Sequence, residues 1–246
     1  MSSTDSEHAR LCVLGAGNTN DLDLSVLLTR FDEVHLIDID VESVDAGVSR
    51  QGFGDDPRIV VRAAEVTGVF DRVERWTAAT PLSPDDLETA ANATTQVAET
   101  IGRESFHVVA SVGLLSQLML SVVRAIGETH PSFMPTLQAI RLGHMRLLAD
   151  LLVPGGVGLL ITDVVSSDSC NALHTAEETQ LPVLLTEEVR RHNFFHGVNP
   201  FIIEKVLRTD PVLAQLIEGI APIHTWKWDV GPRVYAVCGF GFRIKA

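Results

Sequence analysis

Five short apolar runs, separated by stretches of helical character, constrain the fold of this chain more than any other feature. They read RLCVL, EVHLID, RIVVR, FHVVASV and VGLLITD, and begin at Arg10, Glu33, Arg58, Phe106 and Val157. Strands that alternate with helices form a parallel sheet with helices on both faces. The sequence therefore predicts a doubly wound α/β fold.

The segments between these runs carry helix signals. Ser83 and Pro84 suit the cap and the first position of a helix that we expect to reach Ile101. Apolar residues at three- and four-residue spacing predict further helices over 24–31, 115–126 and 137–151.

The last third of the chain follows a different pattern. Residues 165–222 contain no convincing strand and predict short helices after Thr186, after Pro200 and from Asp210. HTWKWDV and RVYAVCGFGFRI follow, joined by Gly231-Pro232, and predict a terminal hairpin. We interpret residues 1–246 as one domain, with 165–222 as a helical insert.

Charge and composition narrow the function. The chain of 246 residues has a net charge of −13 and no cluster of Lys and Arg, so nucleic acid is not an expected partner. No apolar run is long enough to span a bilayer, and no signal peptide is recognisable. Three cysteines make no disulfide framework, so we expect a cytoplasmic protein. Its oligomeric state stays open.

The turn after the first strand indicates a ligand. Gly15 and Gly17 in LGAGNTND allow a tight turn and a close backbone approach. Asp38 ends the second strand, 23 positions after Gly15, where a carboxylate can bind both hydroxyls of a ribose. The alternative for Asp38 is a cap on the next helix, a role that Asp40 could take. We expect a ligand that contains a nucleoside.

Two nucleoside ligands compete for this turn. A dinucleotide favours a third glycine where Asn20 stands, and the charges of Asp21 and Asp23 would repel its pyrophosphate. S-adenosylmethionine carries a cationic sulfur and an amino group, which suit an acidic, amide-rich turn. We therefore favour S-adenosylmethionine as the cofactor.

At this point the chain resembles the class I S-adenosylmethionine-dependent methyltransferases. The resemblance lies in VLGAGNTNDLDL, VHLIDID, LLADLLVPGGVGLLITD and WKWDVGPRVYAVCGFGFRI, taken in this order. It implies a Rossmann-like, mostly parallel seven-stranded sheet whose last strand inserts antiparallel. The family often has an acidic residue where Val13 stands and a third glycine where Thr19 stands.

The resemblance also implies a set of cofactor-binding residues: Gly15, Ala16, Gly17, Asn20, Asp21, Asp38, Ile39, Glu65, Ser111 and Val112. For Glu65, an exposed carboxylate without function is an equal alternative. SVGLLSQL replaces the acidic or aromatic catalytic motif that is common after the fourth strand. The sequence therefore does not identify the methyl acceptor.

Acceptor contacts are expected from the insert over 165–222, as a cap on the site, and from the broken helix over 128–135. FFHGVNPF in this insert could line an acceptor pocket, with His196 as the base, or could be a packed loop. His192 and His196 have a spacing that can bind metal on a helix, but no third ligand is evident and we expect no metal. Trp226 and Trp228 should face the same side of a strand.

Three functions remain. The first is methyl transfer from S-adenosylmethionine to a small molecule, with a protein acceptor as an open alternative. The second is a cofactor-binding protein of the same fold without transferase activity. The third is an NAD-dependent oxidoreductase. A last strand that lies antiparallel between the fifth strand and the one before the hairpin would separate the methyltransferase fold from the dehydrogenase fold.

Overall fold

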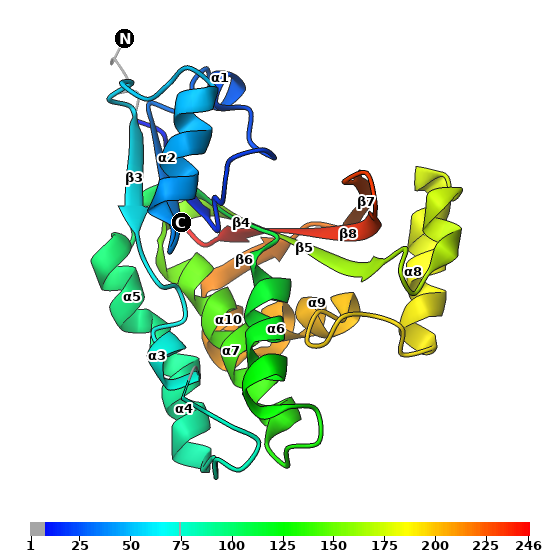
Figure 1. Ribbon diagram of the computed structural model, residues 1–246. Coiled ribbons are helices and arrows are strands. Elements are labelled where there is room, and N and C mark those ends of the chain that lie inside the picture. The colour runs from blue at the N-terminus through cyan, green and yellow to red at the C-terminus, as the bar shows by residue number, and fades with distance from the viewer. Residues whose placement is uncertain (1–7, 74) are drawn as a thin grey trace.

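The computed structural model of the protein describes residues 8–73 and 75–246. Its helices and strands alternate along the first two thirds of the chain (Figure 1). The strands are β1 Arg10–Leu14, β2 Glu33–Asp38, β3 Ile59–Ala63, β4 Phe106–Val112, β5 Leu152–Ser166, β6 Ile217–Ile220, β7 His224–Asp229 and β8 Val234–Ile244. The α-helices are α1 Leu24–Leu27, α2 Val41–Arg50, α3 Phe70–Val73, α4 Pro84–Asn92, α5 Thr94–Ile101, α6 Leu114–Ile126, α7 Phe133–Asp150, α8 Leu181–Arg190, α9 Pro200–Thr209 and α10 Pro211–Leu216.

One sheet organises these elements, with the strand order β3-β2-β1-β4-β5-β8-β6 and with β7 also paired to β8. The first five strands are parallel, and β8 runs antiparallel between β5 and β6. The strands β6 and β7 lie end to end along the same edge of β8. The eight strands therefore occupy seven positions, as the resemblance implied.

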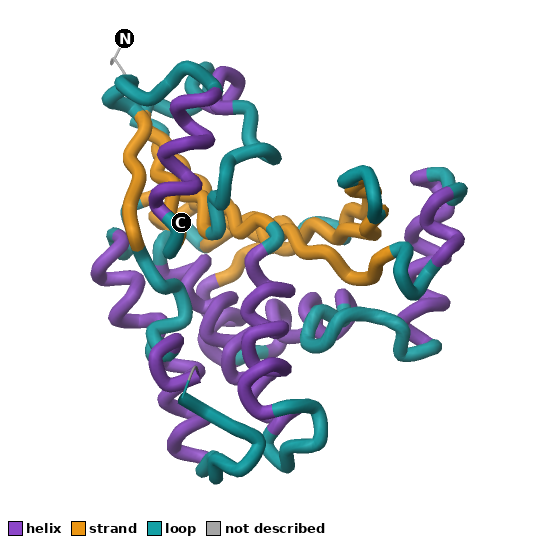
Figure 2. Tube along the Cα trace, in the orientation of Figure 1, coloured by secondary structure: helices purple, strands orange, loops and turns teal. Residues whose placement is uncertain are grey.

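The alternation of β1 divides the core into two clusters. Cys12 and Leu14 pack with the helices α4 to α7, whereas Leu11 and Val13 pack with α1 and α2. The larger helical layer lies on one side of the strands and α2 on the other (Figures 1 and 2). The doubly wound α/β architecture is confirmed. Within the described part of the chain, no helix combines the length and the apolar character that crossing a bilayer requires.

The first helix is much shorter than the predicted 24–31. It ends at Leu27, and the hydroxyl of Thr29 donates to the carbonyl of Val26 at 2.6 Å. Such a bond offers the backbone an alternative to the next helical turn. The predicted helix from Ser83 to Ile101 is also two helices, α4 and α5, which meet at Ala93.

The segment 165–222 is helical in its middle but not at its ends. Ser166 still belongs to β5, because the long strand β8 continues to pair there through Tyr235. Ile217–Ile220 forms β6 on the opposite edge of β8, where no strand was predicted. The helix α8 begins at Leu181 rather than after Thr186, with Pro182 in its first turn.

Candidate functional site

The turn after β1 is built for close backbone approach. Gly15 and Gly17 both have positive φ, at 75° and 50°. A Cβ atom on Gly15 would lie 2.8 Å from Cβ of Leu114, so only glycine lets α6 begin so near the turn. The N–H groups of Gly15 and Ala16 donate to the carbonyl of Ile37, which ties the turn to the end of β2.

Asp38 at the end of β2 is bound to the same turn. One carboxylate oxygen accepts from the N–H of Gly17 at 2.9 Å, and the other accepts from the N–H of Asp40 at 3.0 Å. Each oxygen keeps a lone pair that a hydroxyl group could use. The helix cap that was the alternative for Asp38 belongs to Asp40, which accepts from the N–H of Ser43.

Thr19 stands where the resemblance places a third glycine, and its backbone adopts a conformation that glycine favours. Thr19 is buried and has a φ of 56°, which is an outlier for a β-branched residue. The side-chain amide of Gln51 holds it there, donating to the carbonyl and the hydroxyl of Thr19 and to the carbonyl of Leu22. Gln51 also accepts from the N–H of Leu24 at 3.1 Å. The hydrogen bonds of Gln51 thus stabilise at Thr19 a backbone conformation that a glycine would adopt without strain.

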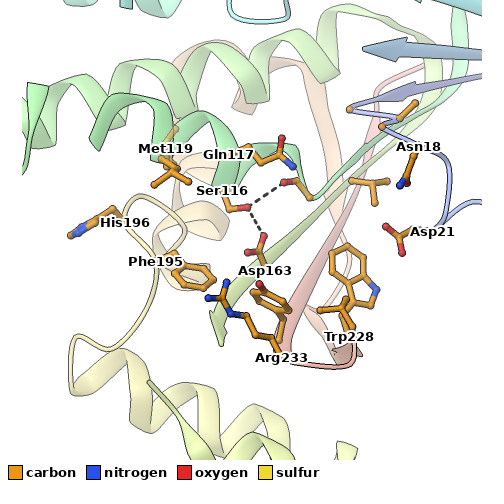
Figure 3. A pocket seen from close by; sticks show the side chains of 18 of the residues that line it. Asn18, Asp21, Ser116, Gln117, Met119, Asp163, Phe195, His196, Trp228 and Arg233 are labelled. Carbon is orange, nitrogen blue, oxygen red and sulfur yellow. Dashed lines mark hydrogen bonds between the residues drawn. The ribbon is translucent and has the colours of Figure 1, made fainter. Parts of the chain in front are cut away.

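A cavity of about 780 Å³ opens beside this turn. Gly15 to Asn18 line one side, and Val112 and Gly113 at the end of β4 line the next. The sheet runs outward in opposite directions from β1 and β4, so the cavity lies at the switch point where α/β folds bind ligands. Asn18 and Asp21 lie together at this end (Figure 3).

The cavity brings together some of the predicted site residues and leaves others outside. Those that line it are Gly15, Ala16, Gly17, Asp21, Val112 and His196. Those that do not are Asn20, Asp38, Ile39, Glu65 and Ser111. Asn18 lines the cavity where Asn20 was expected, and Asn20 is exposed beside it.

The predicted site residues that do not line the cavity have other surroundings. The side chain of Ile39 is 61% exposed. Glu65 accepts bonds from the N–H and hydroxyl of Thr67 and from the N–H of Phe70, so it organises the loop before α3. Ser111 is fully buried on the other face of β4, where its hydroxyl lies 2.8 Å from Nε2 of His144.

Asp163, in the carboxyl-terminal half of β5, is a cavity residue that the sequence reasoning missed. Ser116, in the first turn of α6, donates its hydroxyl to Oδ1 of Asp163 (Figure 3). Burial raises the pKa of Asp163 above its ordinary value, although the bond from Ser116 acts in the opposite direction. A carboxylate after the apolar part of a parallel strand was the available signal, because that end of the sheet faces the ligand.

Aromatic side chains form the wall beyond Asp163. Phe195 and Tyr235 lie with their ring centroids 6.3 Å apart, and Trp228 completes the wall from β7. Trp226 and Trp228 do face the same side of their strand, with ring centroids 6.3 Å apart. Arg233 reaches the rim, where its Nε lies 2.7 Å from Oδ2 of Asp168.

His196 lies at the far side of the cavity. Its Nε2 atom is 3.2 Å from Oε1 of Glu128, and its ring meets Phe133 edge-on at 5.3 Å. The loop that carries it is anchored twice: Arg141 donates to the carbonyl of Gly197, and the N–H of Phe195 donates to the carbonyl of Val164.

The two histidines of this loop do not share a helical face. His192 has a φ of 59°, outside the helical region, and α8 has already ended at Arg190. Among residues 8–73 and 75–246, no three His, Cys, Asp or Glu side chains are grouped so that they could hold a metal ion.

Comparison with known proteins gives matches in structure alone. No protein-family model matches the chain, and no curated protein matches it. A mutant of the 16S rRNA (adenine(1408)-N(1))-methyltransferase from Catenulisporales acidiphilia with cosubstrate SAM has 13% identity and a TM-score of 0.46, over 97% of this chain and 86% of that one. An O-methyltransferase family protein from Burkholderia thailandensis has 13% identity and a TM-score of 0.45, over 97% and 52%.

A putative methyltransferase from Bacillus halodurans has 9% identity and a TM-score of 0.43, over 97% of this chain and 94% of that one. The strand order decides the fold type, since β8 lies antiparallel between β5 and β6 as the resemblance required. The chain has a class I methyltransferase fold. The likeness to these proteins is one of fold, and the function proposed below rests on this chain's own residues.

Proposed function

We propose that this protein is an S-adenosylmethionine-dependent methyltransferase that acts on a small molecule. The observation that carries the proposal is the cavity at the switch point between β1 and β4, walled by the backbone of the glycine turn. This is the place where an open α/β sheet binds a nucleoside ligand. Its volume of about 780 Å³ lies within the range of small-molecule sites.

The residues present fit the cofactor. The turn at Gly15 and Gly17 admits close backbone contact, and Asp38 keeps one lone pair on each oxygen for a ribose diol. Asp21 adds a negative charge to the lining, which favours a ligand with cationic sulfur and amino groups. When bound, the cofactor supplies a methyl group already activated for displacement.

The same turn disfavours a dinucleotide. A pyrophosphate requires free N–H groups at a helix N-terminus. At the start of α1 the carboxylate of Asp23 already accepts from the N–H of Val26 at 3.1 Å, and α1 has only four residues. An NAD-dependent oxidoreductase is therefore the weakest of the three functions.

The chain's own contribution to methyl transfer is placement. The cavity walls orient the acceptor for in-line attack and exclude water. Asp163, held by Ser116, is the side chain best placed to receive a proton from the acceptor. His196 keeps the role of base as an alternative, because it lines the same cavity.

A small molecule is the favoured acceptor because of charge. The protein has 32 acidic and 19 basic residues, which opposes contact with a phosphate backbone. The cavity volume of about 780 Å³ also suits a small molecule, although a protein side chain that enters the cavity stays the alternative.

Calorimetric titration with S-adenosylmethionine, S-adenosylhomocysteine and NAD tests the cofactor. We expect both adenosyl ligands to bind and NAD not to bind. Asp38→Asn should lower their affinity by about tenfold or more, because one acceptor oxygen is lost. Asp40→Asn is the matched control: it changes a neighbouring carboxylate, preserves the cap on α2, and should alter affinity by less than about twofold.

Binding of NAD alone would overturn the proposal. Binding of the adenosyl ligands without any formation of S-adenosylhomocysteine from a broad set of acceptors would instead favour the cofactor-binding protein. Turnover therefore separates the first two functions, and binding separates both from the third.

A further inference from the structure

The carboxylate of Asp163 has no cationic partner in the part of the chain that the structure describes. Its one side-chain hydrogen bond comes from the neutral hydroxyl of Ser116 to Oδ1. Arg233 lines the same cavity, but its guanidinium pairs with Asp168 at 2.7 Å. A carboxylate withdrawn from water is normally paired, so this one is available to a ligand.

The surroundings of Asp163 restrict the ligand further. Phe195 and Trp228 present aromatic rings, and Met119 adds a soft apolar side chain (Figure 3). Tyr235 adds a third ring to the lining. Aromatic faces attract cations as well as apolar groups. A carboxylate and aromatic rings in the lining of one cavity are the chemistry that recognises an ammonium group on an apolar body.

The acidic side chains elsewhere in the lining act in the same direction, whereas the positive charge of Arg233 is paired with Asp168. Asp21 and Glu128 add to the negative potential, and His196 lies against Glu128 at 3.2 Å. A carboxylate acceptor would be repelled by these groups. A neutral alcohol would gain hydrogen bonds but no charge attraction.

We propose that the methyl acceptor is a primary or secondary amine on an aromatic or similarly apolar body, bound through its nitrogen to Asp163. This inference rests on the proposed methyltransferase function and assigns its substrate class. Ser116 is a positioning residue, because its hydroxyl binds Oδ1 and no side chain among the described residues binds Oδ2.

The reaction balances with these groups alone. The bound ammonium gives one proton to the carboxylate of Asp163, and the raised pKa of this carboxyl favours the transfer. The free nitrogen lone pair then forms the N–C bond to the methyl group, and the electron pair of the breaking C–S bond stays on sulfur. The products are the N-methylammonium ion and S-adenosylhomocysteine, and Asp163 later releases its proton to water.

Matched ligands test the substrate class. The probes are phenethylamine, 2-phenylethanol and 3-phenylpropanoate, and the indole series tryptamine, tryptophol and indole-3-propionate. Each is titrated into protein saturated with S-adenosylhomocysteine, and each is assayed for turnover with S-adenosylmethionine. In at least one series we expect the amine to bind about tenfold more tightly than its alcohol and acid, and to be the only methylated member.

Variants assign the preference to Asp163. Asp163→Asn should remove the preference for the amine while retaining S-adenosylhomocysteine binding, which also verifies that the variant is folded. Ser116→Ala should weaken amine binding severalfold without abolishing the preference. Glu99→Gln, which changes an exposed carboxylate on α5 outside the cavity lining, should leave the preference intact.

The outcomes are distinct. Equal binding of the three probes in both series, or a preference for alcohol or acid, overturns the amine assignment and leaves the methyltransferase proposal in place. An amine preference that survives Asp163→Asn overturns the role of Asp163. Failure of S-adenosylhomocysteine to bind the wild-type protein overturns the proposed function and this inference with it.

Discussion

The side of the cavity that we propose for the cofactor and the side that we propose for the acceptor differ in how the chain builds them. The cofactor side centres on one continuous stretch, Gly15 to Asn18, with Val112 and Gly113 beside it. The acceptor side consists of side chains from four separate segments, represented by Ser116, Asp163, Phe195 and Tyr235. The first side is a local structure, whereas the second exists only when the whole chain has folded.

The hydrogen bonds and ion pairs that hold the two sides of the cavity in place differ in the same way. Gln51 and Asp38 hold the glycine turn by bonds to its backbone, and both lie within about one β-α-β unit of it. The acceptor side depends on α7, which anchors the insert through Arg141 at Gly197 and through Arg146 at Asp210. We expect substitutions in the two sets to separate cofactor binding from acceptor binding.

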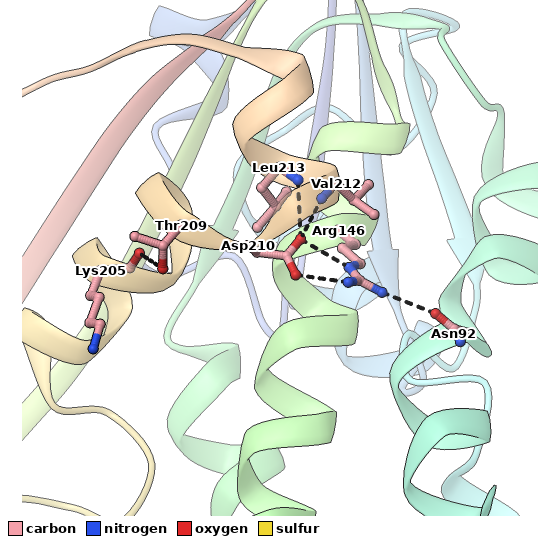
Figure 4. A network of polar contacts seen from close by, with 7 residues as sticks. All are labelled: Asn92, Arg146, Lys205, Thr209, Asp210, Val212 and Leu213. Carbon is pink, nitrogen blue, oxygen red and sulfur yellow. Dashed lines mark hydrogen bonds and ion pairs between the residues drawn. The ribbon is translucent and has the colours of Figure 1, made fainter.

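The largest expected effect belongs to Asp210, which anchors the helices α9 and α10 to α7. Its carboxylate accepts from Arg146 at 2.8 and 3.3 Å and also caps α10 through the N–H groups of Val212 and Leu213 (Figure 4). The side chains of Asp210 and Arg146 are only 8% and 20% exposed. Asp210→Ala should lower the free energy of unfolding by about 4 kcal/mol, because it removes the carboxylate partner of the half-buried Arg146 together with the cap on α10.

Chemical denaturation measures this loss. Glu204→Ala, which breaks the exposed pair with Arg208 on α9, is the control and should cost less than about 1 kcal/mol. Burial opposes the ionisation of Asp210, but the bonds from Arg146 and the backbone outweigh it and lower its pKa. Its contribution is therefore complete above the ordinary pKa near 4 and is lost as pH falls through the lower folded pKa. Equal losses in the two variants would contradict the anchor.

The second-largest expected effect concerns His144, a buried residue of α7. Burial lowers the pKa of His144 from 6.5 to about 4. Because the unfolded chain binds this proton more readily, its contribution to stability is complete above pH 6.5 and falls away toward pH 4. The wild type should lose about 3 kcal/mol over this interval through this group.

The double variant His144→Leu with Ser111→Ala removes the titrating group and its partner together. Urea denaturation at several pH values should give a flatter stability profile for this variant than for the wild type. Cofactor affinity at neutral pH should stay the same in both. A parallel pH profile in the two proteins would rule out a neutral, buried His144.

The third effect tests the cofactor side alone. A Cβ atom on Gly47 of α2 would lie 2.2 Å from the carbonyl oxygen of Asn18 and 2.4 Å from Oγ1 of Thr19. Gly47→Ala should therefore push α2 from the turn, lower the free energy of unfolding by about 2 kcal/mol and weaken S-adenosylmethionine binding by about tenfold. Amine binding to the remaining cofactor complex should change little.

Gly219→Ala is the control for this substitution. No atom lies within 4 Å of a Cβ atom at Gly219, so the added methyl group meets open space on β6. Its stability and its S-adenosylmethionine affinity should match the wild type. If Gly47→Ala binds the cofactor normally, the close packing of α2 on the turn is not needed for the site.

The smallest effect tests the acceptor side alone. A Cβ atom on Gly197 would lie 2.3 Å from the sulfur of Met119, and Gly197 has a φ of 75°. Gly197→Ala should lower stability by about 1 kcal/mol and displace Met119 in the cavity wall, so that amine binding weakens and S-adenosylhomocysteine binding does not.

Gly127→Ala shares the φ of 75° but meets no atom within 4 Å. It should show the same backbone strain without the loss of amine binding, as measured by denaturation and calorimetry. Weaker cofactor binding in Gly197→Ala would mean that the two sides of the cavity are not separable.

Much of the parallel sheet could be predicted from the sequence, because each strand carries its own apolar run. The bounds of β1, β2 and β4 agree with the predicted runs, since a buried strand needs consecutive apolar residues. The strand β6 could not be predicted, because IEGI is short and becomes a strand only through pairing with β8. The length of α1 also depended on a local hydroxyl bond that periodicity does not reveal.

The residues of the candidate site also divide into those that local sequence predicts and those that depend on packing. Gly15, Gly17 and Asp21 line the cavity because a turn between β1 and α1 must lie at that edge of the sheet. Ser111 was placed beside the cofactor, but it is buried on the opposite face of β4, against His144. Alternation along a strand decides which face a residue occupies, and its phase relative to the ligand depends on the neighbouring elements.

The sequence by itself determined the class of fold, the glycine turn, the carboxylate at the end of β2 and the closing hairpin. Each of these depends on residues close together in the chain, through backbone conformation and hydrophobic alternation. Only the tertiary structure decided that Asp163 and Ser116 meet, that aromatic rings from β7, β8 and the 192–199 loop line the same cavity, and that no cation pairs with the carboxylate among the described residues. These residues lie up to 119 positions apart in the chain, from Ser116 to Tyr235, and only the packing of the whole sheet brings them together.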